Sequence, residues 1–193
     1  VLVLGAAGGV GTAAIQVAKA MGATVVAVVH RDQARDFVTG LGADVVLPMT
    51  DGWSKAVREH TDGLGADVAV DPVGGDPFDE AIRALAPEGR LLVLGFAAGG
   101  IPTVKVNRLL LGNTAVLGVA SREFFEQQPR AVADLWARLM ELRRTAALPD
   151  PPVQPYPFAD ARDALRAIAQ RQARGPSQSL SLRRQGKGQP YRH

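Results

Sequence analysis

A glycine-rich turn near the start of the chain constrains the fold most. Residues 5–11 read Gly-Ala-Ala-Gly-Gly-Val-Gly, with an apolar stretch before them and an alanine-rich, helix-forming stretch after them. This order predicts a strand, a tight turn and a helix, which together present helix N–H groups and the positive end of the helix dipole to a phosphate. Gly8 and Gly9 let a phosphate approach the backbone, and Gly11 lets the helix pack closely on the strand. Ala6 breaks the strict G-x-G-x-x-G pattern, so the turn alone does not decide between dinucleotide binding and an ordinary βα connection.

The order of the expected strands and helices is more informative about the fold than the glycine turn, because the two alternate with short turns between them. We expect strands at residues 1–4, 24–29, 44–47, 67–70, 90–94 and 115–119, and helices at 9–21, 32–41, 53–60 and 78–85. Alternation of this kind predicts an α/β fold with a doubly wound parallel sheet, the Rossmann fold, in strand order 3-2-1-4-5-6. The last crossover is expected to be non-helical, and Asp51 is expected to cap the third helix.

Such a sheet binds its ligand at the carboxyl ends of strands 1 and 4, where the strand order reverses. The glycine turn follows strand 1, and Asp71-Pro72-Val73-Gly74-Gly75 follows strand 4. Because both turns fall at the same point, the pattern predicts a dinucleotide site. A Walker A phosphate site is excluded, since no Gly-Lys-Ser/Thr follows the glycine turn.

The remaining chain predicts a helical return segment. Residues 130–144 form a long amphipathic helix in which Trp136 and Met140 are expected in the core. We expect three parts: a nucleotide-binding domain at 1–146, a linker and helix at 147–175, and a basic, disordered tail at 176–193, where 179–182 can form one further strand.

Composition narrows the function classes. The 193 residues are 47% hydrophobic and include no cysteine, which excludes disulfides and thiolate-bound metal and favours a cytoplasmic protein. No apolar run is long enough to span a bilayer, and the histidines have no metal-ligand spacing. The net charge of +3 comes from the tail, which holds Arg183, Arg184, Lys187 and Arg192, so we expect no nucleic-acid or membrane partner.

Several motifs in order resemble the medium-chain dehydrogenase/reductase superfamily, in its zinc-free quinone oxidoreductase branch. They cover nearly all of residues 1–175 and are, by residue numbers, 6–11, 16–23, 41–44, 65–68, 71–75, 88–92, 95–96, 107–111 and 156–161. The resemblance implies a GroES-like catalytic domain that precedes this chain, which we therefore expect to be a piece of a longer protein. It also implies hydride transfer from a nicotinamide cofactor to a quinone or to an alkene conjugated to a carbonyl, without metal.

The end of the second strand bears on the choice of cofactor. NAD-dependent enzymes place a carboxylate there, about 20 residues after the glycine turn, but here His30 and Arg31 occupy that place. Arg31, helped by Arg35 one helical turn later, can pair with a 2′-phosphate, which favours NADPH over NADH. Asp32 argues the other way by its spacing, although we expect it to cap the next helix. The cofactor-binding residues are therefore expected to be Ala7, Gly8, Gly9, Val10, Gly11, His30, Arg31 and Arg35 from the sequence, with Val73, Gly95 and Phe96 near the nicotinamide by resemblance.

Catalytic residues are not identifiable, and three functions stay open: the cofactor half of a quinone reductase, a dinucleotide-binding module without turnover, and an enoyl-reductase module of a larger synthase. Neither Tyr156 nor Tyr191 has a lysine four residues later, which disfavours a short-chain dehydrogenase. The sixth strand would lie exposed at the sheet edge, and relatives pair this strand across a two-fold axis, so we expect a homodimer.

Overall fold

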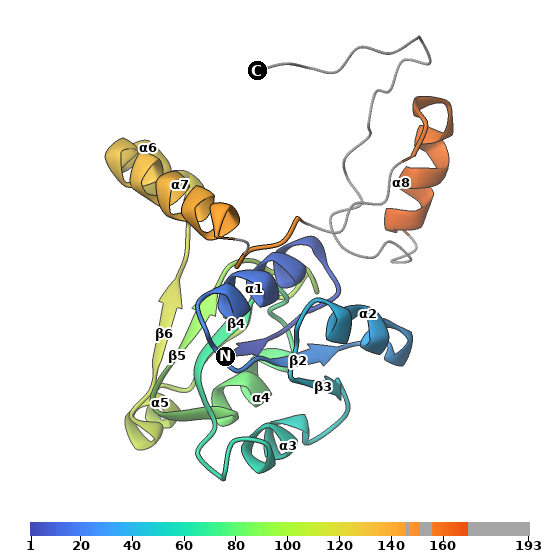
Figure 1. Ribbon diagram of the computed structural model, residues 1–193. Helices are drawn as coiled ribbons and strands as arrows, with labels where there is room; N and C mark the ends of the chain where they lie inside the picture. Colours follow the sequence, from blue (N-terminus) through green and yellow to red (C-terminus); the bar gives the residue numbers. More distant parts are fainter. Residues whose placement is uncertain (146, 151–155, 170–193) are drawn as a thin grey trace.

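The computed structural model describes residues 1–145, 147–150 and 156–169. The six strands β1 to β6 form one parallel sheet in the order β3-β2-β1-β4-β5-β6, which confirms the predicted fold class and strand order (Figure 1). Their bounds are β1 Leu2–Val3, β2 Val26–Val29, β3 Val45–Pro48, β4 Ala66–Asp71, β5 Leu85–Val93 and β6 Ala115–Gly118. Every neighbouring pair is parallel, with register partners such as Leu2 and Ala69 at the centre of the sheet.

Helices cover both faces of this sheet, as Figure 1 shows. The helices of the sheet region are α1 Gly9–Ala20, α2 Arg35–Gly40, α3 Trp53–Glu59, α4 Pro77–Arg83 and α5 Val106–Gly112, with a 3₁₀ turn at Asp32–Ala34. After β6 come α6 Ser121–Gln127, α7 Pro129–Arg144, a second 3₁₀ turn at Phe158–Asp160 and α8 Ala161–Ala169. None of the helices in the described part of the chain is long and apolar enough to cross a membrane.

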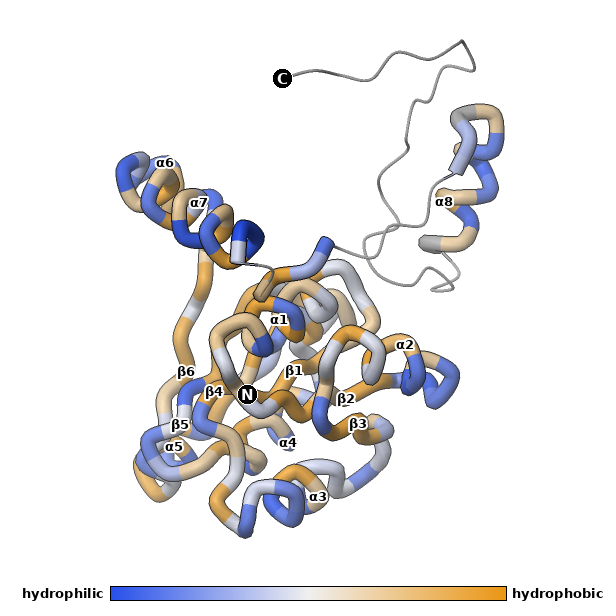
Figure 2. The backbone as a smooth tube through the Cα atoms, viewed as in Figure 1, coloured by the Kyte–Doolittle hydropathy of each residue, from blue (hydrophilic) through white to orange (hydrophobic). Residues whose placement is uncertain are grey.

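Two apolar cores result, one on each face, because neighbouring residues of a strand point to opposite sides. On one face α1 and α2 bury Ile15 and Val38 against strand residues such as Ala27. On the other face α3 and α4 bury Trp53 and Phe78 against strand residues that include Leu2, Val28 and Leu91. The hydrophobic colour in Figure 2 gathers on β1, β2 and β3.

An ion pair fastens α1 to the strands beside it. Lys19 Nζ lies 2.8 Å from Asp44 Oδ2, and the same carboxylate accepts a hydrogen bond of 2.7 Å from the backbone N–H of Val25. These partners, Lys19 above all, hold the pKa of the Asp44 carboxyl below its usual value. Both side chains are about one-third exposed, so the pair contributes mainly to the orientation of the helix.

Several local predictions were wrong. The last crossover contains a helix, α5, which ends at Asn113 in a left-handed conformation with φ of 48°. A short helix, α6, also precedes α7, and Pro129 begins α7. Asp51 does not cap α3, because Gly52 occupies the cap position and no side chain caps the helix.

The long helix α7 does not bury its apolar face in the described structure. Trp136 is 58% exposed and Met140 is 48% exposed, so the prediction that both lie in the core was wrong. The amphipathic pattern does predict the helix, but it does not say what packs against it. The sequence also predicts a helix over residues 158–172, and the structure has a 3₁₀ turn at 158–160 followed by α8 at 161–169. The rest of that helix, the predicted tail at 176–193 and the predicted strand at 179–182 lie outside the described residues.

Candidate functional site at the switch point of the sheet

The glycine turn connects β1 to α1 with a close backbone contact. The N–H of Gly8 donates to the carbonyl of Gly5 over 2.9 Å, and Gly8 then occupies the cap position of α1. No side chain caps this helix end, and its first turn carries no acidic residue. The first N–H groups of α1 therefore point away from the helix without a side-chain acceptor, which suits them to an anion.

Gly11 is the position at which the turn tolerates no side chain. A Cβ built on Gly11 would lie 2.3 Å from the carbonyl oxygen of Gly5 and 2.7 Å from the Cα of Ala6. Both contacts are to backbone, so they cannot be relieved by a change of rotamer. The third glycine thus lets α1 approach the end of β1, as its place in the motif predicts.

The second turn, residues 71–75, follows β4 at the same edge of the sheet. Its glycines Gly74 and Gly75 have φ of 62° and 63°, in the left-handed region. Asp71 Oδ1 accepts hydrogen bonds from the N–H groups of Val73 and Gly74 over 2.8 and 2.9 Å. Burial raises the pKa of the Asp71 carboxyl, and these two donors oppose that rise.

The loop after β5 packs against the second turn. The N–H groups of Ala97 and Ala98 donate to the carbonyls of Pro72 and Val73 over 3.1 and 2.9 Å. Phe96 is 43% exposed, and one ring carbon lies 2.9 Å from where a Cβ on Gly74 would be. The loops that follow β1, β4 and β5 are thus assembled at the point where the strand order reverses.

The structure brings most of the predicted site residues to this edge. Ala7, Gly8, Gly9, Val10 and Gly11 form the glycine turn or the first turn of α1, and Val10 exposes about half of its side chain. Val73, Gly95 and Phe96 lie in the two neighbouring loops, and Val73 approaches the glycine turn, since a Cβ on Gly5 would lie 2.9 Å from its Cγ2.

His30, Arg31 and Arg35 follow β2, the neighbour of β1. His30 and Arg31 are exposed, while Arg35 donates from Nη1 to the carbonyl of Val46 over 2.7 Å and from Nε to Asp32 Oδ1 over 3.2 Å. Asp32 therefore pairs with Arg35, and no side-chain hydrogen bond caps the helix that follows, contrary to the expected capping role. Arg35 therefore has two protein partners, the carbonyl of Val46 and the carboxylate of Asp32.

Two features of this edge were not among the predicted site residues. Asp71 and Gly74 shape the second turn, and the signal in the sequence was the run Asp-Pro-Val-Gly-Gly directly after a buried strand. A turn with two successive glycines at positive φ needs a partner for its N–H groups, and an aspartate two or three residues earlier can supply it.

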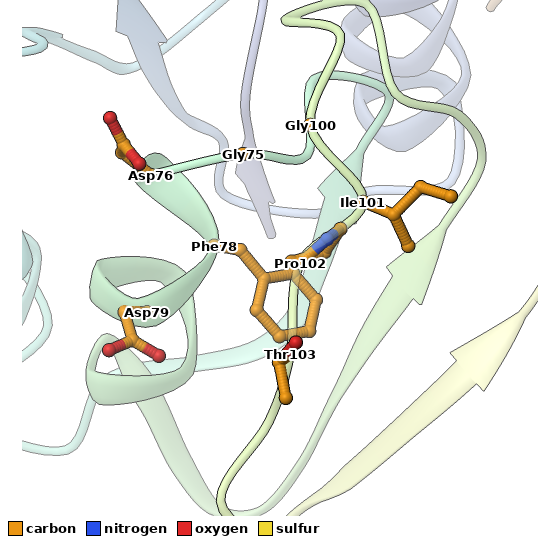
Figure 3. A pocket seen from close by; sticks show the side chains of 8 residues that line it. All are labelled: Gly75, Asp76, Phe78, Asp79, Gly100, Ile101, Pro102 and Thr103. Atoms are coloured by element: carbon orange, nitrogen blue, oxygen red, sulfur yellow. The ribbon is translucent and has the colours of Figure 1, made fainter.

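A shallow pocket of about 380 Å³ lies beside the switch point, between the start of α4 and the loop after β5 (Figure 3). Asp76 and Asp79 lie on one side, with Ile101 and Pro102 on the other. Two carboxylates repel a phosphate, so this pocket does not suit an anion.

The described residues offer no metal centre. No group of three or more His, Asp or Glu side chains among them could hold a metal ion, and the sequence supplies no cysteine. The donor set of a zinc site is therefore not found in the part of the chain that the structure describes.

The fold and the glycine turn define a class: a doubly wound α/β domain of the dinucleotide-binding type. Residues 9–138 match the family described as zinc-binding dehydrogenase. The chain belongs to this family, and the predicted resemblance to the medium-chain dehydrogenase/reductase superfamily is confirmed.

Among its relatives is Quinone oxidoreductase-like protein 2 of Mus musculus, which is 41% identical over 121 residues, 62% of this chain and 35% of the mouse protein. Two solved structures are similar. A probable oxidoreductase from Mycobacterium abscessus is 49% identical with a TM-score of 0.78, over 90% of this chain and 51% of that one. The mycobacterial protein Rv1454c, solved with NADPH, is 30% identical with a TM-score of 0.79, over 90% of this chain and 55% of that one. The chain thus spans between about a third and about half of the proteins to which it is similar.

Proposed function

We propose that the chain binds NADPH at the switch point of the sheet and is the cofactor half of a quinone reductase-like oxidoreductase. The observation that carries this proposal is the close approach of Gly11 to the backbone of Gly5, which leaves no room for a side chain. This approach brings the start of α1, which no side chain caps, to the carboxyl end of β1. The NADPH complex of the similar protein Rv1454c supports the choice of ligand.

The residues present fit such a cofactor. The N–H groups in the first turn of α1 would hold the pyrophosphate, and Arg31, with His30 and Arg35 nearby, would face a 2′-phosphate. The backbone at Val73, Gly95 and Phe96 would adjoin the nicotinamide half. When bound, the cofactor supplies a hydride, and this chain binds and orients it.

We further propose that this hydride goes to a quinone or to an alkene conjugated to a carbonyl, and that the reaction needs no zinc. Fluorescence titration of the 193-residue chain with NADPH tests the binding step. Oxidation of NADPH at 340 nm, with a quinone or with a 2-enoyl thioester, tests turnover and separates quinone reductase from enoyl reductase. Binding without turnover would identify the chain as a nucleotide-binding module that lacks part of the active site. The cytoplasmic location stays a prediction.

Exchanging Arg31 for aspartate should reverse the preference between the two cofactors. We expect Arg31→Asp to weaken NADPH binding by about tenfold or more, because a carboxylate there repels the 2′-phosphate, while NADH binding is kept or improved. The measurement is the ratio of the two dissociation constants. Arg122→Asp on the exposed helix α6 is the control, because it makes the same change of two charge units away from the proposed site. An unchanged ratio in Arg31→Asp would show that Arg31 does not read the phosphate.

We also propose a homodimer that forms through the free edge of β6. Leu117 of this strand is 45% exposed, and no strand in the described part of the chain pairs with the outer side of β6. We expect the chain to sediment as a dimer and Leu117→Glu to shift it to a monomer. Met21→Glu, at an apolar side chain that is 69% exposed at the end of α1, should leave the mass unchanged. A monomeric wild-type chain would refute the proposal.

A further inference from the structure

Asp71 is the one ionisable side chain that is fully buried in the described part of the chain. Its exposed fraction is 0%, while the other buried polar side chains, Thr12, Gln16 and Ser54, are neutral. Its backbone belongs to the sheet, since Asp71 is the last residue of β4 and its carbonyl accepts a hydrogen bond from Leu94 over 2.9 Å. The carboxyl group therefore lies at the carboxyl end of the central strands, and not in the middle of the apolar core.

The two carboxyl oxygens of Asp71 have different surroundings. Oδ1 accepts the N–H groups of Val73 and Gly74. Oδ2 is buried and has no hydrogen-bond partner among the described residues. A buried carboxyl with one unpaired oxygen does not stabilise a fold well, and an apolar side chain of similar volume is often as good or better for stability. The benefit of an aspartate here must then come from the geometry that Oδ1 imposes.

That geometry concerns a turn with unusual backbone angles. Gly74 and Gly75 both have φ near +60°, so the turn has many alternative conformations in the absence of a restraint. Two hydrogen bonds to one carboxyl oxygen align the N–H groups of residues 73 and 74 and select one of these conformations.

The turn in this conformation touches both neighbouring loops of the site. Toward the glycine turn, Val73 Cγ2 fills the space that a side chain on Gly5 would need. Toward the loop after β5, the carbonyls of Pro72 and Val73 accept the N–H groups of Ala97 and Ala98, and the N–H of Gly75 donates to Gly100 over 3.1 Å. A change in the turn would therefore move both loops that the proposed nicotinamide region needs.

We infer that Asp71 is a positioning residue of the cofactor site: it holds the turn at residues 72–75 in the one conformation that fits the glycine turn and the loop after β5. It acts through backbone groups and is not itself in contact with the reacting atoms. This inference rests on the proposed binding of NADPH at the switch point.

The test compares Asp71→Leu, which replaces both carboxyl oxygens by methyl groups in a larger side chain of the same branching, with Asp71→Asn, which keeps one oxygen acceptor and removes the charge. We expect Asp71→Leu to raise the dissociation constant for NADPH about tenfold or more, with a melting temperature close to that of the wild-type chain, because removal of the buried carboxyl offsets the cost of the larger volume. Asp71→Asn should restore the affinity to within about threefold of wild type. Asp76→Leu, at an exposed carboxylate of the same region, should bind NADPH as the wild-type chain does.

A second measurement keeps the inference testable if Asp71→Leu folds poorly. Amide hydrogen exchange on Asp71→Ala should show faster exchange at Val73, Gly74, Ala97 and Ala98, with unchanged protection of the β1 and β2 amides. The positioning role would be overturned if Asp71→Leu binds NADPH as tightly as the wild-type chain. It would also be overturned if every variant loses NADPH affinity in proportion to its loss of global stability. A wild-type chain that does not bind NADPH would instead refute the proposed function, which separates the two failures.

Discussion

Gly11→Ala should abolish measurable binding of NADPH and strongly destabilise the chain. The added Cβ would lie 2.3 Å from the carbonyl oxygen of Gly5 and 2.7 Å from the Cα of Ala6, and all the atoms in its way belong to the backbone. The start of α1 must then move away from the end of β1, which displaces the N–H groups proposed to hold the pyrophosphate. Forced overpacking of this kind typically costs about 1–3 kcal/mol, and more when backbone must shift.

The matched control is Gly40→Ala, because it adds the same methyl group to a helix. Gly40 is the last residue of α2, and a Cβ there meets nothing within 4 Å. We expect this variant to be neutral or slightly stabilising, since alanine has the higher helix propensity. Chemical unfolding and NADPH titration of both variants measure the two effects separately. Gly11→Ala with wild-type affinity would contradict the assignment of the phosphate site to the glycine turn.

The sheet could be predicted from sequence because its signals are local and repeat. Each central strand is an apolar run of a few residues, each is followed by a turn and a helix, and right-handed crossovers then leave few ways to order six strands. The glycine turn after β1 and the Asp-Pro-Val-Gly-Gly turn after β4 could be placed together on the same ground, since both follow strands on either side of the switch point.

The predictions that were wrong concern features that depend on contacts with residues far away in the sequence. The helix α5 is a short run, Val106–Gly112, whose apolar residues are equally compatible with an extended crossover. Trp136 and Met140 lie on the apolar side of a helix, and an apolar side predicts burial only when its partner is known. Burial of Asp71 has the same origin, because nothing in a pentapeptide shows that the surrounding loops close over its carboxyl group.

The candidate site therefore depends on backbone as much as on side chains. Gly11 permits a close approach of helix and strand, and Gly74 adopts a left-handed conformation that Asp71 stabilises. Selection of one cofactor over the other is instead proposed for a charged side chain, that of Arg31 after β2. Affinity and selectivity are thus expected to respond to different substitutions.

A second large effect is expected far from this site, at the loop between α3 and β4. A Cβ on Gly65 would lie 2.6 Å from the carbonyl oxygen of Ala84 and 2.7 Å from the carbonyl carbon of Leu85, with φ at +101°. The same loop is held by Arg58, whose Nη2 donates to the carbonyl of Leu85 over 2.8 Å and whose Nη1 donates to that of Leu64 over 3.1 Å. Gly65→Ala would separate this loop from the start of β5 and weaken those bonds as well.

Gly63→Ala is the control, because Gly63 lies in the same loop and also has a positive φ, but a side chain there would not contact β5. Its φ is +82°, yet a Cβ there meets nothing within 4 Å. Backbone strain alone should cost Gly63→Ala about 1–2 kcal/mol, while Gly65→Ala adds an overpacking term of about 1–3 kcal/mol to a similar strain. Denaturant unfolding of both variants measures the difference directly. Equal losses of unfolding free energy in the two variants would mean that the loop relaxes around the new methyl group. Close packing of residue 65 on β5 would then not be the reason that a glycine is needed there. NADPH affinity measured on the folded fraction should change in neither variant, since this loop leads into the amino end of β4 and the switch point lies at the carboxyl end.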